Sequence, residues 1–119
     1  TDSMAITLNN PPVNTLPLTS PTIDEAIKTE ISGVSVADVN SNLTTTQLTV
    51  TDGVLNVDTS GGATITAGGN DSATLTLSGT GTQINAALAT LKYTGNANVA
   101  TDTLTMTSTD DTSLLTRIA

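Results

Sequence analysis

One stretch of the sequence decides the fold: ATLTLSG (73–79), TGTQINAALATLKYTG (80–95) and, after a short loop, TDTLTMTSTD (101–110). In its first and last segments Leu75, Leu77, Leu104 and Met106 alternate with threonines. A period of two residues gives a segment one apolar face and one hydroxyl face, which is typical of a half-buried β-strand. Both segments are therefore predicted to be strands that border one hydrophobic core.

The middle segment predicts a short helix. Thr82 is expected to cap it, and Ile84, Leu88 and Leu91 recur at spacings of four and three residues, which makes one apolar stripe. We expect this helix to close one end of a sandwich. The predicted core joins the apolar positions of both strands and the helix: Leu75, Leu77, Leu88, Leu91, Leu104 and Met106.

Short strands separated by turn residues are predicted along the rest of the chain. They cover Ile31–Val36 with a bulge at Gly33, Thr45–Thr51, Val54–Val57, Ala63–Ala67 and Ser113–Ala119. Asp52-Gly53 predicts a hairpin turn. About seven to eight strands with turns at regular spacing indicate an all-β fold, an antiparallel Ig-like or cadherin-like β-sandwich with one short helix.

The chain is predicted to have two parts. Residues 1–17 would hold a leading strand, Met4–Leu8, and a Pro-rich linker that begins at Asn10, because consecutive prolines cannot continue a strand ladder. Residues 18–119 would be the sandwich module. Since the sequence starts at Thr1 rather than at a methionine, we expect it to be a piece of a longer protein.

Composition excludes several classes of function. Cysteine and histidine are absent, so thiolate and imidazole metal sites and the commonest general base are missing. We therefore expect no enzyme activity. With eleven carboxylates against three cations, the net charge of −8 disfavours nucleic acid and anionic membranes and favours hard cations such as Ca²⁺. No segment is long and apolar enough to insert into a membrane.

Four motifs carry a resemblance to a known family. In order along the chain they are PVNTLP, IDEA, ISGVSVADVN and GTGTQINAALATLKYTGNANVATDTLTMTSTD. This order resembles the cadherin-like, immunoglobulin-like tandem repeat of large bacterial RTX-type surface adhesins. The resemblance implies an extracellular or cell-surface module that is repeated many times, is stiffened by Ca²⁺ and serves adhesion or biofilm formation. Its partners would be neighbouring repeats of the same chain.

The resemblance also implies a set of calcium ligands: Glu25 at the first strand, Asp38 with Asn40 in the loop after ISGVSV, and Asp110 with Asp111 at the closing strand end. Asn40 and Asn42 stand where the family usually has aspartates, which would lower the ligand charge and weaken calcium binding. Each of these residues could equally belong to a solvated turn.

Three functions stay open. The first is the calcium-stiffened, non-catalytic spacer repeat that the resemblance implies. The second is a ligand-binding module, which the near absence of aromatic residues, 1% of the chain, disfavours for a glycan ligand. The third is a subunit of a self-assembling surface fibre or layer, in which the strand Met4–Leu8 pairs with the open edge of a neighbouring molecule.

Overall fold

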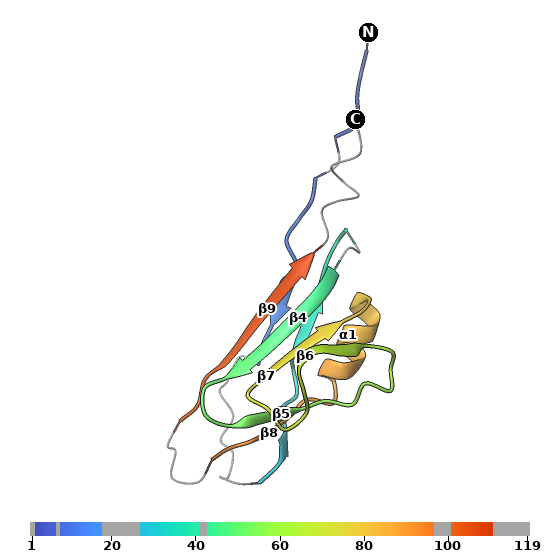
Figure 1. The fold of residues 1–119 in the computed structure, drawn as a ribbon. Coiled ribbons are helices and arrows are strands. Elements are labelled where there is room, and N and C mark those ends of the chain that lie inside the picture. The colour runs from blue at the N-terminus through green and yellow to red at the C-terminus, as the bar shows by residue number, and fades with distance from the viewer. Residues whose placement is uncertain (1, 7, 18–26, 41–42, 97–100, 111–119) are drawn as a thin grey trace.

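The structure, a computed structural model, describes residues 2–6, 8–17, 27–40, 43–96 and 101–110. It is an all-β, sandwich-like fold of antiparallel strands with one short helix (Figure 1). Its elements are β1 (Val13–Thr15), β2 (Thr29–Glu30), β3 (Ser35–Ala37), β4 (Leu43–Val50), β5 (Val54–Asn56), β6 (Thr64–Gly68), β7 (Thr74–Ser78), α1 (Gly81–Leu88), β8 (Lys92–Thr94) and β9 (Leu104–Asp110).

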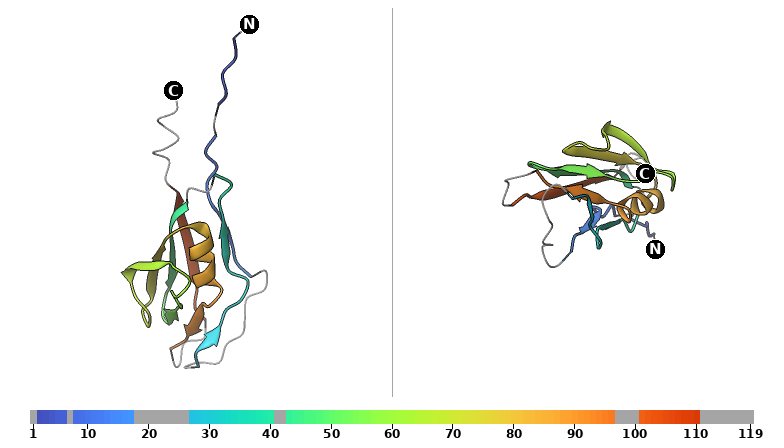
Figure 2. Two further views of the ribbon diagram at one scale, coloured as in Figure 1. Left: turned by 90° about the vertical axis from the view of Figure 1, so that its right-hand side faces the viewer. Right: turned by 90° about the horizontal axis from the view of Figure 1, so that it is seen from below.

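The described strands form three sheets. The largest has the order β6-β7-β4-β9, and the opposite wall is divided into β2-β8-β5 and the pair β1-β3. Val13–Thr15, which lies in the segment assigned above to the linker, pairs with Ser35–Ala37. Two views in Figure 2 show the layers, with α1 lying along one side between the large sheet and β3. The helix therefore closes one side of the sandwich and not, as predicted, one end.

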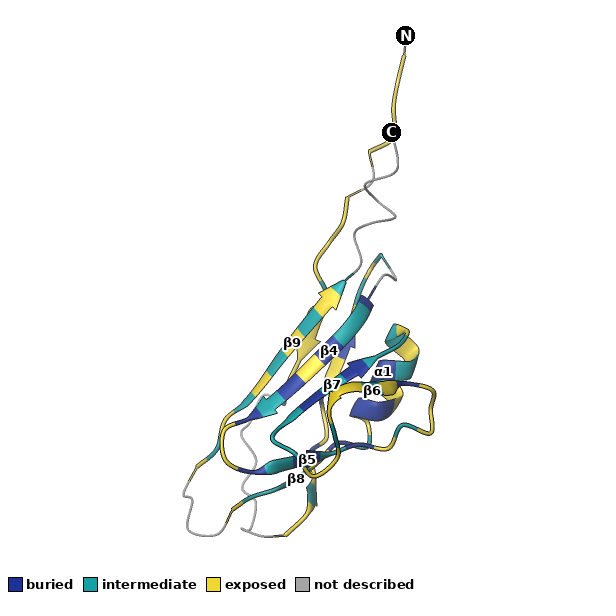
Figure 3. Ribbon diagram, in the orientation of Figure 1, coloured by how far each residue is buried: buried dark blue, intermediate teal, exposed yellow. Residues whose placement is uncertain are grey.

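The core is aliphatic and lies between these layers. Leu75, Leu77, Leu88 and Leu91 are buried as predicted, and they belong to one cluster with three more fully buried aliphatic side chains, Leu48, Leu55 and Ile84. Leu104 and Met106 pack against this cluster but are only half-buried (Figure 3). β9 lies at the edge of its sheet, and it forms no strand ladder with β1, the described strand beside it.

Asp52-Gly53 does not make the predicted hairpin. The flanking strands β4 and β5 belong to different sheets, so this turn carries the chain from one wall of the sandwich to the other. Gly53 is buried against β8, and a Cβ at this position would lie 2.5 Å from the ring of Tyr93. Glycine is required here because of that close approach, which the local sequence does not reveal.

The helix begins earlier and ends earlier than predicted. Its N-cap is Thr80, whose hydroxyl accepts a hydrogen bond from the Gln83 backbone N–H while the Gln83 side chain accepts one from the Thr80 N–H. This capping box satisfies two otherwise free donors of the first turn. Thr82 is exposed on the first turn instead of capping it, and Leu91 is buried beyond the helix end, next to β8.

The side chain of Asn85, on the helix, forms hydrogen bonds with the edge of β3 that faces away from β1. Its Oδ1 accepts a hydrogen bond from the Val36 N–H at 2.8 Å, and its Nδ2 donates to the Val36 carbonyl oxygen, also at 2.8 Å. An amide side chain thus takes the place of a neighbouring strand. Val36 is 3% exposed, so water cannot readily replace this partner.

Asn85→Ala is therefore expected to lower the free energy of unfolding by about 2–3 kcal/mol, because it leaves both backbone groups of a buried residue without partners. Urea denaturation monitored by circular dichroism measures this change. Thr82→Ala is the matched control on the same helix, and its exposed side chain predicts a change of less than about 0.5 kcal/mol. Equal effects of the two substitutions would contradict a special role for Asn85.

The predicted leading strand is not a strand in this structure. Of Met4–Leu8, the described residues 4–6 and 8 belong to no strand, and they project away from the sandwich (Figures 1 and 3). Met4, Ile6 and Leu8 are among the most exposed large apolar side chains of the described chain.

Candidate functional site

Three of the five predicted calcium ligands are linked by hydrogen bonds to or through residues 8–10, where the N-terminal segment leaves the sandwich. Asn40 donates from Nδ2 to the Leu8 carbonyl oxygen at 2.9 Å and accepts at Oδ1 from the Asn10 N–H at 2.7 Å. On β9, Asp110 accepts a hydrogen bond at Oδ2 from Asn9 Nδ2 at 2.8 Å. Asp38 joins the group through its bond to Asn40. We call Asp38, Asn40 and Asp110 together with residues 8–10 the clasp.

Asp38 has one satisfied and one unsatisfied carboxylate oxygen. Its Oδ1 accepts a hydrogen bond from the Asn40 N–H at 2.9 Å, which shapes the loop after β3. Its Oδ2 is buried and has no hydrogen-bond partner among the described residues. A buried oxygen without a donor is costly, and a bound cation would satisfy it.

The donor chemistry of the clasp suits a hard cation. Calcium accepts carboxylate, amide and backbone carbonyl oxygens, and the clasp offers Asp38, Asp110, Asn40 Oδ1 and the Leu8 carbonyl. Nowhere in the described ranges do three acidic side chains gather within reach of one metal ion. A calcium site here would therefore depend on neutral oxygens as well. The other two predicted ligands, Glu25 and Asp111, lie outside the described residues.

A second polar cluster was not predicted from the sequence. The carboxylate of Asp102 lies over the β4–β5 turn and accepts hydrogen bonds from the N–H groups of Thr51 (2.8 Å), Asp52 (3.2 Å), Gly53 (2.7 Å) and Thr103 (2.8 Å), and from the Tyr93 hydroxyl (2.6 Å). Asp102 precedes β9, so it ties both walls of the sandwich to the turn between them. The local sequence around Asp102 could not show that residues 51–53 lie against its carboxylate.

The two ionisable side chains of this cluster, Asp102 and Tyr93, shift each other's pKa. Burial raises the pKa of Asp102, but the hydrogen bonds from Tyr93 and the backbone outweigh burial, so the pKa lies below its ordinary value. Burial, followed by the hydrogen bond to Asp102, raises the pKa of Tyr93 to about 12. Such a pair is held in one charge state at neutral pH, with Asp102 ionised and Tyr93 neutral. This arrangement supports structure rather than proton transfer.

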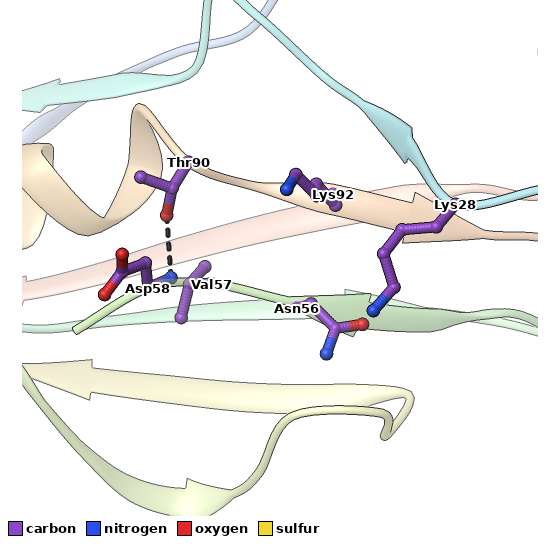
Figure 4. Close-up of a pocket in the computed structure, with 6 residues that line it drawn as sticks. All are labelled: Lys28, Asn56, Val57, Asp58, Thr90 and Lys92. Carbon is purple, nitrogen blue, oxygen red and sulfur yellow. Dashed lines mark hydrogen bonds between the residues drawn. The ribbon is translucent and has the colours of Figure 1, made fainter. Parts of the chain in front are cut away.

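A shallow pocket of about 230 Å³ lies beside β5 and β8 (Figure 4). It is lined by Lys28, Asn56, Val57, Asp58, Thr90 and Lys92, and therefore holds two of the three cations of the chain. The hydrogen bond from the Ser60 N–H, at 2.8 Å, holds the pKa of Asp58 below its ordinary value. The lining contains no aromatic side chain that could stack against a sugar ring, so the pocket does not favour glycan binding.

Comparison with protein-family models, with curated proteins and with solved structures found no match. The likeness to the adhesin repeat therefore depends on the sequence motifs alone and stays a prediction. Over the described ranges, no helix has the length and apolar character to cross a membrane.

Proposed function

We propose that this chain is a non-catalytic, extracellular spacer repeat of a long bacterial surface protein involved in adhesion, and that calcium stiffens it at the clasp. The clasp is the observation that supports this function. It fastens an exposed N-terminal segment to the end of a sandwich, as a junction between successive modules requires.

Mechanically, the clasp limits how the N-terminal segment bends relative to the sandwich. Asn40 engages the backbone of Leu8 and Asn10, while Asp110 engages the side chain of Asn9, so the segment is gripped from two elements. These contacts are mostly exposed, and each is expected to contribute only modestly in water. A joint that depends on them alone would open often.

Calcium would supply the missing rigidity. The ion would be held by Asp38 and Asp110, with Asn40 and the Leu8 carbonyl as neutral ligands and with Glu25 and Asp111 as further candidates. Bound Ca²⁺ would offset the repulsion between carboxylates in a chain of net charge −8 and satisfy the buried Asp38 Oδ2.

Calcium is therefore expected to raise the melting temperature, and more in a tandem pair of copies than in a single copy, because a neighbouring module can add ligands. Stabilisation reaches about 2.7 kcal/mol when free calcium is about a hundred times the Kd. Thermal unfolding of both proteins in calcium and in chelator measures the effect.

Asp38→Asn and Asp110→Asn should each remove most of the calcium response. Asp71→Asn is the matched control, since Asp71 is exposed, and at its φ of 62° asparagine is well tolerated. Melting temperatures that are the same in calcium and in chelator would refute the calcium-stiffened spacer.

A further inference from the structure

The N-terminal segment presents a row of apolar side chains to solvent. Met4, Ile6 and Leu8 are 77%, 74% and 69% exposed, and they occur at every second residue. In a β-strand this spacing places all three on one face. Such a face is stable in water only when a sheet covers it.

The sandwich has an incomplete seam between β1 and β9. The two strands lie side by side, but among the described residues each has a backbone partner on one side only, β3 for β1 and β4 for β9. The Asn14 side chain bridges them: its Nδ2 donates to the Met106 carbonyl oxygen at 3.1 Å, and its Oδ1 accepts from the Ser108 hydroxyl at 2.5 Å. The Met106 carbonyl therefore faces the seam.

The seam also leaves apolar surface uncovered. Leu104 and Met106 of β9 pack against the core but remain half-buried, and Val13 of β1 is 62% exposed. Because strand residues alternate the direction of their backbone groups, Leu104 and Ser108 present theirs on the same side as Met106. The edge of β9 thus offers both backbone partners and an apolar row.

We propose that the segment Met4–Leu8 of one copy of this chain adds as a strand to β9 at the seam of a second copy. Met4, Ile6 and Leu8 then continue the apolar row of Leu104 and Met106, and backbone hydrogen bonds replace those of the Asn14 side chain. The segment cannot fill its own seam, because the clasp holds residues 8–10 at the end of the sandwich and residues 4–6 point away from it (Figure 1).

Charge favours this pairing of surfaces. Two copies of net charge −8 repel each other, so a contact between them is best made where neither carries charge. Residues 3–17 contain no charged side chain, and neither do residues 103–109. The joining strand and its acceptor are therefore both neutral.

The opposite edge of the large sheet, β6, is a poorer acceptor. In β6 the register shifts between Ile65 and Ala67, and Gly68 has a φ of 71°. Irregularities of this kind protect edge strands from pairing. Its inward side also offers only Ile65 as a large apolar residue.

The first test is sedimentation of the full chain over a range of concentrations, in calcium and in chelator. The unaltered chain should self-associate in both, which separates this inference from the calcium proposal. Ile6→Asp should weaken association by roughly tenfold or more, because the carboxylate would be buried without a partner. Ile27→Asp is the matched control, since Ile27 is 55% exposed and lies outside both surfaces, and it should associate like the unaltered chain. A monomer at all concentrations, or equal weakening by both substitutions, would overturn the proposal.

The second test uses the absence of cysteine from the chain. Copies that carry Ile6→Cys are mixed with copies of different mass that carry Met106→Cys and are mildly oxidised. A mixed disulfide should form between Ile6→Cys and Met106→Cys in higher yield than between Ile6→Cys and Ile65→Cys on β6. Its yield should also exceed that between Ile27→Cys and Met106→Cys. Equal yields for β9 and β6 would refute the seam as the acceptor.

Discussion

Leu75→Ala is expected to lower the free energy of unfolding by about 3–5 kcal/mol, which is a large share of the total for a domain of this size. Leu75 is fully buried on β7, opposite Leu48 of β4, and its removal leaves a cavity that aliphatic neighbours cannot close without moving. No phenylalanine or tryptophan is present in the chain to stabilise the core in its place. Chemical denaturation at neutral pH measures the loss.

Leu104→Ala is the matched control because it removes the same atoms from a neighbouring position of the same sheet. Leu104 is half-buried at the seam, so the expected loss is about 1–2 kcal/mol. Similar losses at both positions would mean that β9 is covered as fully as β7, and that the half-burial of its inward face is incorrect.

The second large effect is expected from Asp102→Ala, which should cost about 2–4 kcal/mol at neutral pH. The substitution leaves the N–H groups of Thr51, Gly53 and Thr103 and the Tyr93 hydroxyl without their acceptor. Tyr93→Phe should cost less, since it removes one of these bonds and leaves the carboxylate paired with the backbone. Asp52→Ala is the control, because its exposed side chain lies on the same turn.

This effect should depend on pH with a defined sign. Folding lowers the pKa of Asp102, so its ionised form stabilises the fold above its unfolded pKa of about 3.9, and this contribution is lost as the pH falls through the lower folded value. The difference in stability between the unaltered chain and Asp102→Ala should thus shrink as the pH falls below about 4. Urea denaturation at several pH values tests this, and a difference that stays constant over the range would contradict the assigned role.

The fold class could be predicted because it depends on local periodicity. Apolar residues that alternate with threonines, Leu75 and Leu77 in one segment and Leu104 and Met106 in the other, predict half-buried strands wherever they lie in the molecule. The structure has β7 and β9 there. The spacing of Ile84 and Leu88 likewise predicts one buried helix face, and both residues are buried. In each case the pattern repeats within one element, so neighbouring residues carry the information.

Pairing between distant residues could not be predicted, because several partners were compatible with the same local pattern. Asp52-Gly53 is as suitable for a hairpin as for a crossing between sheets, and the choice depends on Tyr93 and Asp102, which lie far along the chain. Thr82 was predicted as the helix cap, and the structure has Thr80 there instead because Thr80 forms the reciprocal bond with Gln83.

The candidate site, too, could be predicted only in part from the sequence. Composition favoured a hard cation held by oxygen ligands, and the resemblance to the adhesin repeat implied Asp38, Asn40 and Asp110 among those ligands. Only the tertiary structure showed that hydrogen bonds link Asn40 and Asp110 to residues 8–10. The physical reason is that sequence determines what each residue can bond to, whereas the packing of strands far apart in the chain determines which of those bonds are within reach.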